Sequence, residues 1–400
     1  MPKGDKFADG PTPFPYIRVT DFAGFGVDLS DLRYLRPDTQ AFIKRYTIST
    51  RDVYISIAGS IGLTGMIPRE LEGANLTENA AKLVITAPEV DGRFLMYFLG
   101  SETAQKEILS QTVKNAQPKL ALARISSLRV PLPPTEEQQK IVEVLGVVQR
   151  GIEQQERLLA LTAELKKALL HKLFTEGLRG EPQKQTEIGP VPENWEVKPL
   201  SDYLTEAQYG ISAKGAETGR YAVLRMTNQQ QGKISGANLQ YVELTPAQFA
   251  KSRVERQDIL FNRTNSLELV GRTAIFDLEG DFVFASYLIR LRTDSARLRP
   301  SFLNHYFNCD ETQVRLKSIA TQAVSQSNIS ATRLRGFAIP VPLPEDQDEI
   351  VSNVEAVDRK FAVHRRKQAA LTDLFRTLLH QLMTAQIRVH DLEWPKLEDS

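Results

Sequence analysis

The stretch Pro131–Val142, PLPPTEEQQKIV, has a near copy in Pro340–Val351, PVPLPEDQDEIV. In both stretches prolines keep the chain extended, and the acidic residues that follow place negative charge at the positive end of a helix. Thr135 can cap the first helix, and Pro344 suits the first turn of the second. About 40 residues almost free of helix breakers follow each start, which predicts two helices about 60 Å long.

Apolar residues recur at steps of three or four along both predicted helices. So narrow a stripe is typical of a coiled-coil seam and not of a helix sunk into a globular core. Since each helix carries one stripe and a globular domain separates them, we predict that they pair antiparallel, with the two front domains at opposite ends of the pair. The alternative is that each helix folds onto its own domain. Gly146 and Gly151 are weak points, because glycine costs up to about 1 kcal/mol relative to alanine. The stripe comprises Ile141, Leu145, Val148, Ile152, Leu158, Leu161, Leu165, Leu169 and Leu173, then Ile350, Val354, Val357, Phe361, Leu371, Leu374, Leu378 and Leu382.

The duplication extends far beyond these helix starts, at an offset of about 205 to 209 residues. YIRVTDF from Tyr16 aligns with YAVLRMTN from Tyr221, and RDVYIS from Arg51 aligns with QDILFN from Gln257. LLHKLFT near the end of the first long helix likewise matches LLHQLMT near the end of the second. The chain is therefore a tandem repeat of one unit, in which a front domain precedes a long helix.

These patterns predict an α+β fold with two β-rich domains, each followed by a long helix, and with the two helices pairing as an antiparallel coiled coil. Strand-like runs lie at 53–57, 82–86, 258–262 and 282–292, and one amphipathic helix is predicted at 93–109 and again at 300–319. Aromatic residues at helical spacing in these helices, Phe94, Tyr97, Phe302 and Tyr306, are predicted to be core. The predicted boundaries are 1–134 for a first domain that is short at its N-terminus, 135–179 for its helix, 180–192 for a linker, 193–343 for the second domain, 344–390 for its helix and 391–400 for a tail.

The composition is that of an ordinary globular protein. The chain has 400 residues, of which 42% are hydrophobic and 25% charged, and its net charge is +1. No apolar run approaches the roughly 20 residues of a membrane span, so we expect a cytoplasmic protein without membrane contact. A single cysteine, Cys309, excludes an internal disulfide and a cysteine-based zinc site, and we expect it to be a partly buried helix residue.

Motifs of catalysis are absent from the sequence. There is no phosphate loop, no HExxH, no GxSxG and no Asn-Pro-Pro-aromatic motif of a methyltransferase, and GSIGLTG from Gly59 lacks the lysine of a phosphate loop. His171 and His380 hold equivalent places in the two long helices, which favours a structural or surface role. The sequence therefore favours a binding protein or a scaffold over an enzyme.

Two β-rich domains, each ending in a proline-rich helix start and followed by a long helix that closes with LLHxLxT, resemble the specificity subunit of a type I restriction–modification system. WEVKPLSDYL from Trp195 also resembles the entry to a target-recognition domain of that family. The resemblance implies that each domain recognises half of a bipartite, asymmetric site on double-stranded DNA. It also implies that the paired helices set the distance between the half-sites and dock two DNA adenine methyltransferase subunits, which recruit restriction and translocase subunits. Catalysis would then belong to those partners, with S-adenosylmethionine, ATP and magnesium bound there and no cofactor or metal in this chain.

The first copy departs from this pattern at its beginning. In the second copy the segment from Trp195 to Ser212 precedes AKG at Ala213, whereas nothing comparable precedes the matching PKG at Pro2. We expect that the first domain either begins late or receives the missing strand from elsewhere, for example from the C-terminal RVHDLEWPKL.

Polar residues suited to DNA recur on three loops of each copy: after the opening strand, after the strand that begins near Asp52 or Asp258, and before the second proline run. Cationic side chains suit phosphates, and Arg, Asn and Gln suit base edges. NRTNS from Asn262 is the segment most typical of base recognition. The predicted DNA-binding residues are Arg18, Thr20, Ser56, Ser60, Lys114, Asn115, Gln117, Lys119, Arg225, Asn228, Arg263, Thr264, Asn265, Gln322, Ser325 and Gln326.

Two other functions remain open at this point. One is a coiled-coil scaffold whose duplicated domains bind proteins, and the other is a DNA-binding protein that works without methyltransferase subunits. Because the net charge is only +1, DNA contact depends on local patches, and we expect the affinity of the chain alone to be modest and strongly salt-dependent.

Overall fold

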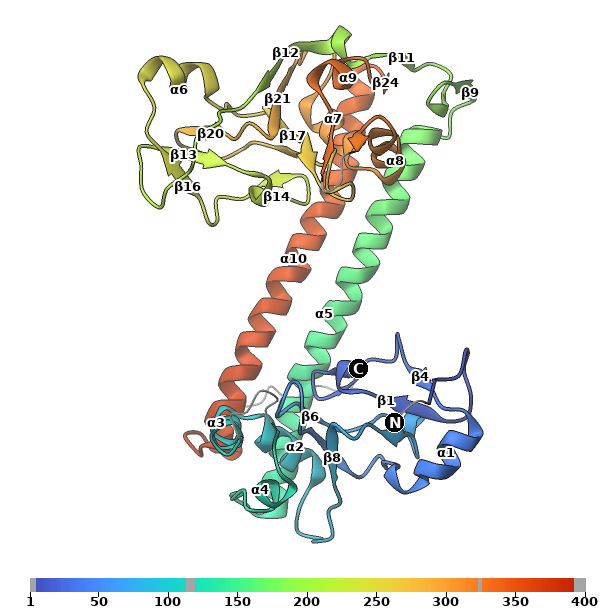
Figure 1. Cartoon of the computed structure of the whole chain (residues 1–400), viewed down its shortest axis with the longest axis vertical. Coiled ribbons are helices and arrows are strands. Elements are labelled where there is room, and N and C mark those ends of the chain that lie inside the picture. Colours follow the sequence, from blue (N-terminus) through green and yellow to red (C-terminus); the bar gives the residue numbers. More distant parts are fainter. Residues whose placement is uncertain (1–4, 113–118, 323–325, 392–400) are drawn as a thin grey trace. The chain divides into compact units, whose positions relative to one another are not determined.

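The computed structural model describes residues 5–112, 119–322 and 326–391, and it divides into two compact units (Figure 1). Unit 1 comprises residues 1–156 and 366–400, and unit 2 comprises residues 157–365. Each unit contains one β-rich domain and part of both long helices, α5 (Thr135–Glu176) and α10 (Pro344–Met383). The predicted α+β class, with two β-rich domains each followed by a long helix, is confirmed.

The two long helices pair antiparallel. In unit 1, Gly151 of α5 lies directly against Leu371 of α10, and Glu156 accepts a hydrogen bond from Gln368 at 3.2 Å. The position contacted on α10 thus moves toward its start as α5 proceeds, which means that the helices run in opposite directions. Gly151, which costs helix stability by itself, permits the close approach of Leu371.

Polar residues occupy part of the seam between these helices. Leu161, Leu165 and Leu374 are exposed, so their assignment to the seam is wrong. On α5 the seam runs through Thr162, which is buried, and Lys166, whose Nζ lies 2.5 Å from Asp358 Oδ1 of α10. Several helix faces can be traced by steps of three and four residues, so spacing alone does not identify the face in the seam. A charged residue is tolerated there when an opposite charge on the other helix is within reach.

The domain of unit 1 is built on two small sheets. One sheet has the order β4-β1-β7, with β1 antiparallel to β4 and parallel to β7, and the other has the order β6-β5-β8 and is antiparallel. Their strands are β1 (Pro15–Ile17), β4 (Arg33–Tyr34), β5 (Val53–Ser56), β6 (Thr64–Gly65), β7 (Asn75–Leu76) and β8 (Ala80–Leu83). The hairpin of β2 (Phe22–Ala23) and β3 (Gly26–Val27) and the helix α1 (Pro37–Ile43) lie between strands, and α4 (Leu122–Ser126) precedes α5.

The domain of unit 2 repeats this plan with longer strands. Its first sheet has the order β16-β13-β20, and its second has the order β12-β21-β17-β19-β15-β14. A small sheet β18-β23-β22 and a pair β11-β24 complete it. The elements are β11 (Glu196–Pro199), β12 (Leu204–Tyr209), β13 (Tyr221–Leu224), β14 (Gln229–Gln230), β15 (Lys233–Ile234), β16 (Gln240–Val242), α6 (Pro246–Ser252), β17 (Ile259–Asn262), β18 (Thr264–Asn265), β19 (Thr273–Ile275), β20 (Phe282–Phe284), β21 (Leu288–Thr293), β22 (Thr321–Gln322), β23 (Ser327–Asn328), α9 (Ala331–Arg335) and β24 (Ala338–Val341).

Each copy has two short helices where the sequence predicts one. They are α2 (Gly92–Gly100) and α3 (Glu102–Ser110) in unit 1, and α7 (Pro300–Phe307) and α8 (Asp310–Ser318) in unit 2. The breaks come at Ser101 and Cys309, whose extended backbone starts a new helix, and the Ser101 hydroxyl accepts the N–H of Ala104. Cys309 is fully buried, and burial raises the pKa of its thiol.

The predicted aromatic core is confirmed, because Phe94, Tyr97, Phe302 and Tyr306 are all buried. The segment predicted as a linker, 180–192, contains a hairpin of β9 (Gln183–Thr186) and β10 (Gly189–Pro192). No helix within the described residues combines the length and the apolar character that crossing a membrane requires.

The start of the second copy packs into the core and the sheet of unit 2. Trp195 is buried in the core of unit 2, and β12 pairs along the outer edge of β21. Strand β8 of unit 1, the counterpart of β21, pairs only with β5 among the described strands. Part of the C-terminal tail does pack in unit 1, where Val389 is buried and Arg388 Nη1 lies 3.2 Å from the Glu137 carboxylate. Residues 392–400 and the PKG at Pro2 lie outside the described residues.

Candidate nucleic-acid interface

In unit 2 the three predicted loops lie together. Strand β18 of the second loop pairs antiparallel with β23 of the third, with Asn265 opposite Ser327, and β23 also pairs with β22. The amide nitrogen of Asn265 lies 3.0 Å from the sulfur of Met226, which belongs to the first loop. Tertiary structure thus joins three segments that are far apart in sequence into one polar surface.

Arg263 is held at the centre of this surface. Its guanidinium carbon lies 4.6 Å from the centroid of the Tyr209 ring, and its Nη2 donates to Asn328 Oδ1 at 3.3 Å. Asn328 in turn donates to the hydroxyl of Thr264 at 2.7 Å. Asn328 belongs to the third loop predicted from sequence, whereas Tyr209 was not predicted, because nothing local in β12 indicates that it stacks on Arg263, which follows β17.

Several buried polar atoms of this region lack a hydrogen-bond partner. Among the described residues they include Arg225 Nε, Asn262 Oδ1 and Arg263 Nε. Such atoms are rare in folded proteins, and each of them calls for a physical explanation. Two arginines and an asparagine beside the three loops thus have hydrogen-bonding capacity that the described chain does not use.

Asn228 does not belong to the set of accessible residues. It is buried, its Oδ1 accepts the N–H of Arg225 at 3.0 Å, and its Nδ2 donates to the carbonyls of Ser235 and Ala237. The side chain therefore shapes the first loop, and the structure contradicts a base-contacting role for it. Gln322 and Gln326 of the third loop are exposed, as such a role requires.

Unit 1 builds the same first loop with carboxylates. Asp21 accepts the N–H of Arg18 at 2.7 Å, as Asn228 does for Arg225. Arg18 Nη2 lies 2.5 Å from Asp21 and 3.2 Å from Asp31, and the hydrogen bond to Asp21 raises the pKa of the guanidinium. The charge of Arg18 is therefore neutralised within the loop, which weakens its prediction as a phosphate contact.

The other predicted residues of unit 1 differ in accessibility. Ser56 is fully buried, and its hydroxyl donates to Ser60 O at 2.5 Å while it accepts the N–H of Leu63, so the structure contradicts a DNA contact for it. Thr20, Ser60 and Lys119 are exposed, and a bridge between Ala58 and Lys119 joins the second loop to the third. Four predicted residues, Lys114, Asn115, Gln117 and Ser325, lie outside the described residues.

No group of three histidine, cysteine, aspartate or glutamate side chains gathers as metal ligands in the part of the chain that the structure describes. The surface built from the three loops offers hydrogen-bond donors and acceptors on a rigid frame. This arrangement suits recognition of a polar partner.

Sequence comparison assigns both copies to one domain family. The family of the type I restriction modification DNA specificity domain matches residues 1–163 and 192–373. The chain belongs to this family. The first matched segment ends within α5, and the second begins just before the second domain and ends within α10.

Named relatives of the family are similar over part or most of their length. The MjaX type I restriction enzyme specificity subunit of Methanocaldococcus jannaschii is 30% identical over 210 residues, which cover 52% of this chain and 49% of the relative. The MjaVIII specificity subunit of the same organism is 23% identical over 80% of this chain and 76% of its own, and the EcoKI specificity subunit of Escherichia coli is 21% identical over 85% and 74%. The chain thus spans about half the length of the first of these relatives and about three quarters of the other two.

Solved structures share the fold. The S subunit of a type I restriction–modification system from M. genitalium superposes with a TM-score of 0.55 at 17% identity, over 93% of this chain and 89% of that one. A chain from a structure of complex assembly and conformational transition in the type I system gives 0.54 at 15% identity, over 92% and 91%.

Proposed function

We propose that this protein is the DNA-recognition subunit of a type I restriction–modification complex. One domain would recognise each half of a bipartite, asymmetric site on double-stranded DNA. The observation that carries this proposal is the match of the specificity-domain family to both copies of the repeat, together with the joining of three polar loops in unit 2. Two linked recognition domains with different loops suit an asymmetric site.

The paired helices are the proposed docking surface for two methyltransferase subunits, which in turn would recruit the restriction and translocase subunits. Large exposed apolar side chains on a helix pair support this role, and Leu161 and Leu165 of α5 are two of them. Methyl transfer, DNA cleavage and the binding of S-adenosylmethionine, ATP and magnesium belong to the partners in this proposal, and the complex acts in the cytoplasm. A protein-binding scaffold is the weaker candidate, since the matching family is one of DNA specificity domains.

The decisive experiment is to map methylated adenines across the genome of a host that carries this chain with its methyltransferase subunits. We expect one bipartite, asymmetric site. Exchange of the second domain, residues 193–343, for that of a relative should change one half-site and leave the other unaltered. If the assembled complex methylates no bipartite site and binds DNA without sequence preference, the proposal is wrong. The highly purified chain alone should transfer no methyl group to DNA.

A further inference from the structure

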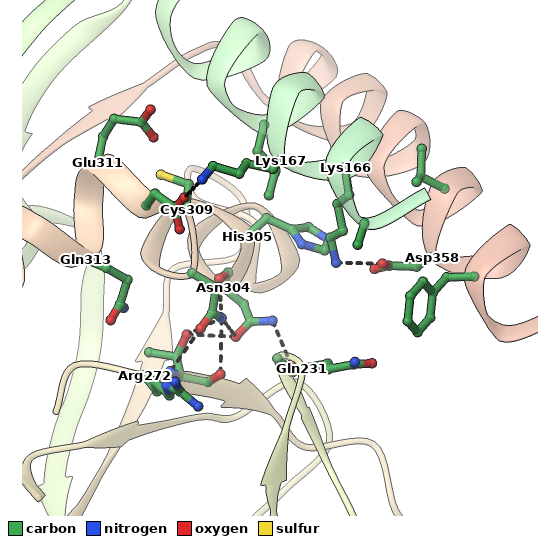
Figure 2. A pocket seen from close by; sticks show the side chains of 18 of the residues that line it. Lys166, Lys167, Gln231, Arg272, Asn304, His305, Cys309, Glu311, Gln313 and Asp358 are labelled. Carbon is green, nitrogen blue, oxygen red and sulfur yellow. Dashed lines mark hydrogen bonds and ion pairs between the residues drawn. The ribbon is translucent and has the colours of Figure 1, made fainter. Parts of the chain in front are cut away.

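Unit 2 contains a cavity of about 500 Å³ between the helix pair and the β-rich domain (Figure 2). Its walls come from α5, α10, the α7–α8 pair and the turn between β14 and β15. Figure 2 shows Lys166, His305 and Asp358 on one side of it and Gln231 and Asn304 on another.

The corresponding space in unit 1 is filled with aromatic rings. Phe25, Tyr97 and Phe375 form a triad with ring centroids 5.0, 5.7 and 6.0 Å apart. The internal repeat places Gly232 where Phe25 stands, His305 where Tyr97 stands and Lys166 where Phe375 stands. Side chains therefore fill this space in unit 1, whereas unit 2 leaves it open as a cavity.

Backbone contacts confirm this equivalence. The carbonyl of Phe25 accepts the N–H of Met66 at 3.1 Å, and the carbonyl of Gly232 accepts the N–H of Ile275, the counterpart of Met66, at 3.0 Å. Asn308 of α7–α8 stands where unit 1 has Gly100, at which any added side chain would overlap the Phe25 ring. The backbone of the fold is therefore compatible with a filled space, and the cavity of unit 2 results from differences in a few side chains.

The cavity pairs an apolar side with hydrogen-bonding groups. Leu170, Val357 and Phe361 supply apolar surface. The Oε1 atom of Gln229 is buried and has no partner, while its Nε2 donates to Leu260 O at 2.7 Å. Burial, aided by the charge of Lys166, lowers the pKa of His305 to about 4, so its ring is neutral near pH 7 and offers one donor and one acceptor.

Charges around the cavity are balanced. Lys166 Nζ pairs with Asp358 at 2.5 Å, and Lys167 Nζ pairs with Asp310 at 2.8 Å. The remaining lining charges are cations at Arg272 and Lys317 and carboxylates at Glu268 and Glu311. A phosphate group gains little from such a site, so a nucleotide or the DNA backbone is a poor occupant. An uncharged planar group that donates hydrogen bonds is a good one.

We infer that this cavity receives a hydrogen-bonding aromatic side chain, a tyrosine, tryptophan or histidine, from the methyltransferase subunit that docks on unit 2. The inference rests on the proposed function. Leu161 and Leu165, which are exposed, lie beside Thr162 and Lys166 of the cavity wall on α5, so the cavity continues the proposed docking surface. Buried aromatic anchors commonly dominate the energy of protein interfaces. Because unit 1 fills the same place itself, the two methyltransferase subunits would be held with unequal affinity.

A first experiment probes the cavity in the full chain without any partner. N-acetyl-tyrosinamide, N-acetyl-tryptophanamide and N-acetyl-histidinamide are titrated while the imidazole resonances of His305 are followed by NMR. We expect saturable binding of at least one amide and none of N-acetyl-leucinamide. The triple variant Lys166→Phe, His305→Tyr, Asp358→Gln carries the residues of unit 1, and ligand-detected NMR should show affinity reduced about tenfold or more. Gln230→Ala, an exposed change in the same hairpin, is the matched control and should leave binding unchanged. Binding of adenosine in place of the amides would overturn the inference in favour of a nucleobase site.

A second experiment measures assembly with the methyltransferase subunit. The triple variant should bind one methyltransferase subunit as the parent chain does and the other about tenfold more weakly or worse, with both half-site sequences unaltered. His305→Tyr alone provides a milder version should the triple variant unfold at lower temperature. Parent-like assembly of a folded variant would overturn the inference. Failure of the parent chain to bind methyltransferase at all would instead contradict the proposed function, and the amide titration would still decide what the cavity accepts.

Discussion

Gln138 and Gln347 make the same three hydrogen bonds in the two copies of the repeat. Both side chains are fully buried. The Nε2 of Gln138 donates to Glu89 O and Pro133 O at 2.9 and 2.8 Å, and its Oε1 accepts the N–H of Asp91. Gln347 does the same with Arg297 O, Pro342 O and the N–H of Arg299. Each glutamine therefore ties the start of a long helix to the N-cap residue of α2 or α7, which explains why the duplicated stretch keeps a glutamine at this place.

Replacement of either glutamine should destabilise the unit that contains it. Gln138→Ala removes these three hydrogen bonds, at a cost of about 1–3 kcal/mol, and Gln138→Glu should cost more because a carboxylate would face both carbonyls. Urea unfolding followed by hydrogen exchange of α2 and α7 assigns the loss to one unit. Gln139→Ala, at an exposed neighbour, is the control. An equal loss of stability from Gln138→Ala and Gln139→Ala would contradict the role of the three hydrogen bonds.

Replacement of one partner of the Lys166–Asp358 pair should lower the stability of unit 2, whereas replacement of both partners together should hardly change it. Both side chains are largely buried, at 26% and 20% exposure, so Asp358→Asn alone should destabilise unit 2 by about 1–3 kcal/mol. The double change Lys166→Met, Asp358→Leu should be close to neutral, because it removes both charges together. A double-mutant cycle by denaturant unfolding measures the coupling. Additive single changes would show that the pair contributes no interaction energy.

Stability of unit 2 should depend on pH through His305. Its pKa is lowered from 6.5 to about 4 in the folded chain, where Lys166, Lys233 and Asp358 face it. Between pH 6.5 and 4 the unfolded chain binds a proton that the folded chain refuses, so stability is full above pH 6.5 and falls toward pH 4 by at most about 1.4 kcal/mol per pH unit. His305→Gln should flatten this part of the profile in thermal unfolding. If stability of the variant depends on pH as steeply as that of the parent chain, a group other than His305 is responsible.

Arg263 should govern one half-site only. Arg263→Ala in the assembled complex is expected to relax discrimination at the half-site of unit 2 by about 1–3 kcal/mol and to leave the other half-site unchanged. Competition binding with single-base variants of each half-site gives the measurement. Asn228→Ala is the comparison, because it should lower the stability of the first loop instead. An equal loss at both half-sites would mean that Arg263 serves folding.

Salt should weaken DNA binding by the chain alone. With a net charge of +1, only local patches neutralise phosphates, and the exposed Lys119 is one candidate cation. The logarithm of the association constant should fall linearly with the logarithm of salt concentration, as measured by fluorescence anisotropy. Binding that is indifferent to salt would contradict phosphate contacts.

Local patterns in the sequence were sufficient for the architecture. Prolines and acidic residues mark the starts of α5 and α10, apolar periodicity predicts their pairing, and the repeat predicts two β-rich domains. Each of these signals acts over one or two helical turns or is visible by aligning the chain with itself. The three loops of the candidate interface were predicted for the same reason, since their polar residues recur at fixed places of the repeat.

Tertiary structure decided what each side chain does. Ser56 and Asn228 are polar like Ser60 and Gln326, but both are buried and bound to the backbone of the turns that follow them. Lys166 stands in the seam because Asp358 of the antiparallel helix reaches it, whereas Leu161 does not. The cavity of unit 2 arises where Gly232, His305 and Lys166 meet from three separate segments. The partners in the seam and around the cavity lie far apart in sequence, and whether a polar side chain is buried depends on packing, so only the folded chain determines both.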